Sequence, residues 1–127
     1  MKEYQEFKVI IPKEVIVTET DYIEKGEYLG TIIDIQQRKK SILLRIKVEN
    51  ELDTVFVGFI NLYMDYQPRD FLEDIIHKTG DDSSDVFLDR RVMFEVEDYE
   101  NKKNQLASRI VFIDDNEDGQ YYIEEEE

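Results

Sequence analysis

The sequence predicts a mainly β domain of five strands, with a single helix between the third and fourth. Residues 41–49 alternate between apolar and polar side chains, which is typical of a strand with one buried face. Further segments rich in β-branched and aromatic residues occur at 27–37, 54–63, 91–99 and 106–113. A chain of 127 residues suits one domain, so these segments are expected to share one core.

The first two strands are expected to form a hairpin. Residues 27–37 and 41–49 are separated only by the polar residues 38–40. In the second of these strands the alternation places Arg45 and Lys47 on the face opposite the apolar one. The hairpin therefore presents a basic turn and a partly basic outer face.

The third strand, residues 54–63, is apolar on both faces. Phe56 and Phe59 lie an odd number of residues apart, so they should point to opposite faces and one of them should lie outside. The predicted helix follows, with Pro68 at its first turn and Gly80 beyond its last, the positions that these residues favour at helix ends.

The last two strands form a second hairpin, in which residues 100–105 make a polar, basic connection. Five strands with a helix between the third and fourth is the order of the OB-fold, a small, partly open Greek-key barrel. Gly30 in the first strand agrees with the sharp bend that a small barrel needs. Another α+β sheet with the same element order is the alternative.

The chain divides into three parts around this domain. Residues 1–26 are predicted to be an N-terminal arm or extra edge strand, since Pro12 disfavours a central strand. Residues 27–113 form the OB-fold domain. Residues 114–127 carry eight acids and no base, which predicts an acidic flexible tail.

Composition limits the chemistry. The chain has no cysteine and one histidine, so disulfides, thiolate metal sites and histidine clusters are not expected. We find no catalytic motif, and we expect no enzyme activity, cofactor or metal. No apolar run reaches the roughly 20 residues of a membrane span, and residues 1–12 lack a signal-peptide pattern. A cytoplasmic protein without membrane contact is expected.

Basic residues are concentrated in two stretches of an otherwise acidic chain. The net charge is −15, yet residues 31–50 and 101–113 each carry +3. In an OB-fold the loops between strands 1–2 and 4–5 flank the usual binding face, and single-stranded nucleic acid needs cations for phosphates and flat rings for bases. The candidate phosphate-binding residues are Arg38, Lys39, Lys40, Arg45, Lys47, Lys102 and Lys103, and the candidate stacking residues are Phe56, Tyr63 and Tyr99.

Four features resemble a known family. They are the opening KGEYLGTIIDIQQRKK, the strand FVGFINLY with its helix DFLEDIIHKTG, the ending LDRRVMFEVEDYENKKNQLASRIVFI, and an acidic tail. Residues 26–114 resemble the single-stranded DNA-binding OB-fold proteins of bacteria and their phages. The resemblance implies a non-enzymatic role in DNA replication or recombination, on a phage or mobile element. It also implies single-stranded DNA as partner, with replication or recombination proteins contacting the tail.

Two other functions fit the same elements. An acidic OB-fold protein-interaction module would not bind nucleic acid. A DNA-mimic inhibitor would carry carboxylates spaced like phosphates and occupy a basic enzyme. The sequence also leaves open a homo-oligomer, in which residues 7–17 pair along a sheet edge between subunits.

Overall fold

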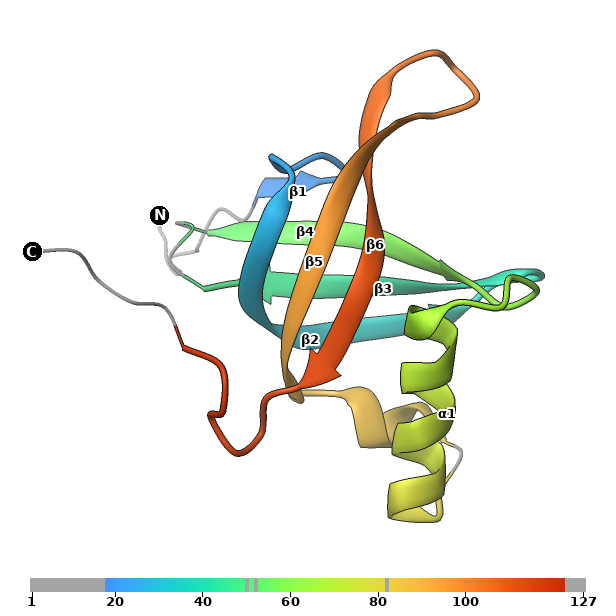
Figure 1. Cartoon of the computed structure of the whole chain (residues 1–127), viewed down its shortest axis with the longest axis vertical. Coiled ribbons are helices and arrows are strands. Elements are labelled where there is room, and N and C mark those ends of the chain that lie inside the picture. The colour runs from blue at the N-terminus through green and yellow to red at the C-terminus, as the bar shows by residue number, and fades with distance from the viewer. Residues whose placement is uncertain (1–17, 50, 52, 82, 123–127) are drawn as a thin grey trace, which may run out of the picture.

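The computed structural model describes residues 18–49, 51, 53–81 and 83–122. The fold is mainly β, with a six-stranded mixed sheet of order β1-β4-β3-β2-β5-β6 and one α-helix after β4 (Figure 1). The elements are β1 (Thr18–Thr20), β2 (Gly26–Gln37), β3 (Ser41–Val48), β4 (Thr54–Asn61), α1 (Gln67–Thr79), the 3₁₀ helix (Ser84–Phe87), β5 (Arg91–Glu100) and β6 (Leu106–Asp115).

The five predicted strands and the predicted helix are all present, and β1 is a sixth strand at the edge of the sheet. The hydrogen-bonded ladders leave the sheet open instead of closing it into a barrel. Among the described residues β4 and β6, which lie close to each other, share no ladder.

β2 joins the two halves of the sheet, because it pairs with both β3 and β5. Gly30 takes part in both ladders, opposite Val48 on one side and Val92 on the other. A Cβ atom at Gly30 would lie 2.6 Å from the Ile46 side chain and 2.7 Å from the Lys47 carbonyl oxygen. Glycine is therefore required for this close approach, and it permits the strong curvature of β2 seen in Figure 1.

β1 and the residues after it connect β4 with β6. β1 runs parallel to β4, with Thr18 opposite Thr54. Beyond β1, Ser108 of β6 donates its backbone N–H to the Asp21 carbonyl at 2.9 Å. The Ser108 hydroxyl donates to the Ile23 carbonyl at 2.7 Å and accepts from the Ile23 N–H at 2.9 Å. This segment thus occupies the space between two strands that share no ladder.

The core lies inside the curved sheet and is capped at one end by α1. Phe56 and Phe94 stack at its centre with ring centroids 5.7 Å apart. α1 packs against β6, β4 and the 3₁₀ helix, and it ends at Gly80, whose φ of 70° suits glycine. The fully buried core residues include Ile32, Leu44, Ile46, Val48, Ile60, Val92, Val96, Ile110 and Ile113.

Residues 114–122 belong to the stretch predicted to be an acidic flexible tail, and β6 extends into it as far as Asp115. The Asn116 side chain donates to the Tyr121 carbonyl at 3.1 Å and accepts from the Tyr121 N–H at 2.8 Å. The Tyr121 hydroxyl donates to Asp114 at 2.6 Å, and Glu117 accepts the Arg91 N–H at 2.7 Å. Charge counting does not reveal such hydrogen bonds, because it considers only composition. Residues 123–127, like residues 1–17 with the proposed pairing segment, lie outside the described residues.

Of the described helices, none combines the length and apolar character that a membrane crossing requires.

Candidate nucleic-acid interface

A groove on the outer surface lies between β4 and the β5–β6 hairpin. Its volume is about 240 Å³. We call it the outer groove, and its lining residues are Ser41, Phe59, Asn61, Met64, Tyr66, Tyr99, Ser108 and Arg109. It therefore combines an exposed strand face, the chain just beyond β4, and the paired strands β5 and β6.

The alternation of β4 decides which phenylalanine reaches this groove. Phe56 has no exposed surface, whereas Phe59 is 44% exposed. The prediction that one of the two lies outside is confirmed, but Phe56, predicted to stack on bases, is a core residue stacked on Phe94. Phe59 is the residue whose ring lines the groove.

The segment after β4 adds further tyrosines. Tyr63 is 74% exposed, and its backbone N–H donates to the Asn61 side chain at 2.8 Å, which fixes the turn. The Tyr66 hydroxyl accepts the Asn61 N–H at 3.0 Å. Burial raises the pKa of the Tyr66 hydroxyl above its usual 10.0. Tyr63 is exposed, but it is not among the residues that line the outer groove.

The β5–β6 hairpin supplies an aromatic ring and a cation together. The Arg109 guanidinium carbon lies 5.7 Å from the centroid of the Tyr99 ring, within the range of a cation–π contact. Tyr99 was a predicted site residue, whereas Arg109 was not named. Arg109 lies in the positively charged stretch 101–113, which could have suggested it as a site residue. The sequence did not show that its side chain is exposed on β6.

Four predicted lysines lie exposed in the two hairpin turns. Arg38 N–H donates to the Ser41 carbonyl at 2.7 Å and closes the first turn, which carries Lys39 and Lys40. In the second turn, the Asn101 side chain accepts the N–H groups of Lys103 at 2.9 Å and Gln105 at 3.0 Å. The exposed turn lysines are Lys39, Lys40, Lys102 and Lys103. None of the four forms an ion pair with another described residue.

One strand residue near each basic turn lies in the outer groove. Ser41 follows the first turn and Tyr99 precedes the second, and both line the outer groove. In Figure 1 the β5–β6 hairpin projects at the top of the molecule, whereas the β2–β3 hairpin ends at its right-hand side. The groove thus contains aromatic rings and Arg109, and it lies next to the strands that lead into the two basic turns.

Arg45 does not contribute a free cation. Its guanidinium forms ion pairs with Glu19 at 3.2 Å and with Asp34 at 2.8 Å. The predicted phosphate contact at Arg45 is thus replaced by an ion pair across three strands. Lys47 shares the outer face of β3 but pairs with Val55 at the far end of β4, away from Ser41, and the structure does not bring it to the groove.

Within the described ranges, no group of three or more histidine or acidic side chains is arranged to hold a metal ion. Compared with models of protein families the sequence matches none, and no curated protein shows significant similarity to it. The interpretation of the groove therefore depends on its own geometry.

Proposed function

We propose that this chain is a non-enzymatic single-stranded DNA-binding protein, in which the outer groove holds unpaired bases and the two basic turns hold phosphates. The observation that carries the proposal is that Phe59 and the Tyr99–Arg109 pair line one groove. Base stacking and a cationic path along the backbone are the two components of single-strand binding.

The strand connections support an OB-fold interpretation of the sheet. β2, β3 and β4 follow one another as antiparallel neighbours, β5 returns to pair with β2, and β6 pairs with β5. α1 lies between β4 and β5 in sequence. We propose that this is a variant OB-fold in which β1 and the residues up to Ile23 occupy the position where β4 and β6 would otherwise pair.

The chemistry favours a single strand over a duplex. The exposed Phe59 and Tyr63 rings offer flat apolar faces, and a base can stack on them only when its own face is uncovered. In a duplex the neighbouring base pairs cover those faces. Stacking also tolerates every base, so we expect binding without sequence preference.

The expected affinity is modest, because the chain carries a net charge of −15 and repels polyanions outside the two turns. The role in replication or recombination, the phage or mobile-element setting and the tail-bound partner proteins are proposed from the family resemblance. The cytoplasmic location is proposed from the sequence pattern. The functional site itself is proposed from the groove.

A titration of fluorescent oligothymidine at low salt tests the function. We expect binding at tens of micromolar protein or below. Lys39→Glu and Lys103→Glu should each weaken binding, because each replaces a turn cation with an anion. Lys78→Glu is the control, because this substitution makes the same charge change on α1, away from both turns. In the wild-type chain Lys78 pairs with Asp115.

Absence of binding at these concentrations would reject the proposal. Equal weakening by all three charge reversals would also reject it, because the effect would then reflect net charge and not the two turns.

A further inference from the structure

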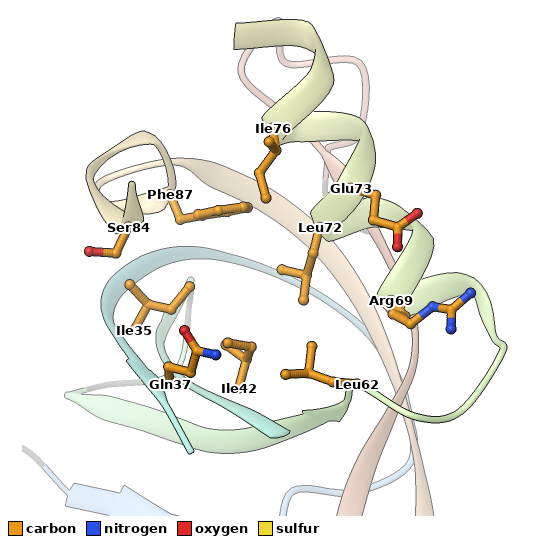
Figure 2. A pocket seen from close by; sticks show the side chains of 10 residues that line it. All are labelled: Ile35, Gln37, Ile42, Leu62, Arg69, Leu72, Glu73, Ile76, Ser84 and Phe87. Carbon is orange, nitrogen blue, oxygen red and sulfur yellow. The ribbon is translucent and has the colours of Figure 1, made fainter. Parts of the chain in front are cut away.

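Two of the cavities outside the outer groove differ in the charge of their lining. The larger has a volume of about 520 Å³ and lies between α1, the 3₁₀ helix and the β2–β3 hairpin (Figure 2). Figure 2 shows mostly apolar side chains around it, with Arg69 and Glu73 as the charged ones. One cation and one anion favour neither sign of ligand, so this lining does not select an occupant.

The smaller cavity lies where the chain after β6 turns back beside the curved strand β2 (Figure 1). We call it the β2–β5 pocket, and its lining residues are Glu27, Tyr28, Leu29, Met93, Tyr121 and Tyr122. Its volume is about 260 Å³, below the roughly 300–1,000 Å³ of pockets for drug-sized ligands. The β2–β5 pocket therefore suits a small chemical group.

Part of this lining is apolar and held in place before any ligand binds. Leu29 lies opposite Met93 in the β2–β5 ladder, and both side chains are buried. Tyr121 is fixed at its backbone by the Asn116 side chain and at its hydroxyl by the Asp114 carboxylate. A ligand would therefore not have to order these side chains, which lowers the cost of binding.

Tyr122 adds an aromatic ring that is largely uncovered. Its side chain is 73% exposed although it lines the pocket. Tyr28 contributes less ring surface, because its ring stacks on Phe94 with the centroids 5.7 Å apart. The faces of tyrosine rings are electron-rich and attract cations, so Tyr121 and Tyr122 favour a positively charged ligand.

The charge of the lining has the same preference. Glu27 is exposed and is the one charged residue of the pocket, which none of the described lysines or arginines lines. The hydrogen bond to Asp114, burial, and the negative charges of Asp114 and Glu27 raise the pKa of Tyr121 above 10.0. Both carboxylates thus act on the Tyr121 hydroxyl.

The cations nearest in the two strands do not reverse this preference. Arg91 lies two residues before Met93 and is paired with Glu49 at 3.9 Å. Lys25 is exposed two residues before Glu27. Against these two cations stand several further carboxylates on the adjoining segments, namely Glu24, Glu95, Asp114 and Glu117.

We propose that the β2–β5 pocket binds a quaternary ammonium group, of the kind carried by choline and by trimethylated lysine. Tyr121, Tyr122 and Glu27 would meet the positive charge, and the methyl groups would pack on the apolar floor. A primary ammonium is more strongly hydrated, so its transfer from water into such a pocket costs more. This inference does not depend on the proposed function, because the β2–β5 pocket and the outer groove share no lining residue.

Choline and its neutral tert-butyl analogue test the charge dependence, because carbon replaces nitrogen in the analogue and the shape is kept. Each is titrated into the ¹⁵N-labelled full chain at constant ionic strength and followed by heteronuclear NMR. We expect choline to shift the amide signals of Leu29, Met93 and Tyr121. The neutral analogue should bind about fivefold or more weakly, since it lacks the cation–π attraction.

Two capped peptides, one with trimethyllysine and one with unmodified lysine, identify the source of the group. The trimethyllysine peptide should shift the same signals, and the lysine peptide should bind more weakly. Tighter binding of the trimethyllysine peptide than of choline would support a modified protein as the natural ligand. The reverse order would support a free small molecule.

Tyr122→Leu should weaken choline binding by about two- to fivefold, because leucine keeps apolar contact but lacks an aromatic face. Tyr122→Phe should retain binding. Tyr63→Leu is the matched control, since Tyr63 is 74% exposed and lies outside the pocket. Glu27→Gln should weaken binding by about twofold or more, whereas Glu73→Gln, at an exposed carboxylate of α1, should not.

The proposal is overturned if choline leaves the three signals unchanged, or if its neutral analogue binds equally well. It is also overturned if Tyr122→Leu binds choline as tightly as Tyr63→Leu does. Equal effects of Glu27→Gln and Glu73→Gln would overturn it too. Because Tyr122 and Glu27 are exposed, these variants are expected to fold.

Discussion

At the scale of single residues, the function of β4 depends on which of two phenylalanines faces the core. Gly58 between them shares the inner face with Phe56, and a Cβ there would lie 2.7 Å from the Phe56 ring and 2.9 Å from Ile110. The missing side chain gives the Phe56 ring its space. The sequence predicted opposite directions for Phe56 and Phe59, but the choice of Phe56 as the stacking residue was wrong, because apolar residues fill both faces of this strand and its pattern does not show which face is buried.

Phe59→Ala should weaken oligothymidine binding by about 1–3 kcal/mol for each base that stacks on the ring. The free energy of unfolding of the Phe59→Ala variant should change little, because the Phe59 ring is 44% exposed. Phe56→Ala should lower the free energy of unfolding by about 3–5 kcal/mol, as for other large core deletions. Fluorescence anisotropy and urea unfolding measure the two effects. The assignment of roles fails if Phe59→Ala unfolds the protein while binding per folded molecule is unchanged.

Tyr121 makes stability sensitive to alkaline pH. Its hydroxyl donates to the Asp114 carboxylate, and this hydrogen bond, with a smaller effect of burial, raises the pKa of Tyr121 above 10.0. A raised pKa in the folded state means that the contribution to stability is complete below pH 10 and is lost as pH rises through the folded value. Urea unfolding of wild type and Tyr121→Phe should therefore converge at high pH, and a constant difference would contradict this.

At the scale of elements, the hairpins were predictable because each strand carries its own periodicity. The turn at 38–40 and the turn at 100–105 followed from that pattern, and so did the placement of their lysines. β1 was not predictable as a defined strand, because its three residues, Thr18–Thr20, are too few to show an alternation of apolar and polar side chains. It is held by hydrogen bonds to distant residues such as Asp53, whose carbonyl accepts the Thr18 N–H at 2.8 Å.

Ser108→Ala tests how β1 is attached. The Ser108 side chain is the partner of both the N–H and the carbonyl of Ile23, and the residue is 5% exposed. Its loss removes the partner of two polar groups of the partly buried Ile23, so we expect a decrease of about 1–3 kcal/mol in the free energy of unfolding. Ser83→Ala, at an exposed serine whose hydroxyl caps no helix, should have almost no effect. Thermal or urea unfolding of both variants provides the comparison.

At the scale of the whole molecule, charge distribution matters more than net charge. The binding of a polyanion by a chain of net charge −15 requires its free cations to be gathered at one surface. Sequence composition located the two basic stretches, but it could not show that Arg45 is neutralised. That pairing needs Asp34 on the neighbouring strand and Glu19 from β1, which come together only in the folded sheet.

The salt dependence of oligothymidine binding reports how many cations act. Arg38 and the four turn lysines provide five candidate phosphate contacts. For single strands, each neutralised phosphate contributes about −0.7 to the slope of log affinity against log salt concentration. A plot of log affinity against log salt concentration should therefore fall with a slope of about −3 to −4. Lys103→Glu should make the slope shallower by about one contact, whereas Lys78→Glu should not. A slope near zero would indicate that phosphates are not bound.

The shared position of β2 has a consequence for folding kinetics. The ladder between β2 and β5 joins residues as distant in the chain as Gly26 and Val96, with α1 and the 3₁₀ helix between them. Neither half of the sheet can enclose the Phe56–Phe94 stack until that long loop has closed. Because such nonlocal closure must precede the contacts that reward it, this small domain is expected to fold slowly for its size.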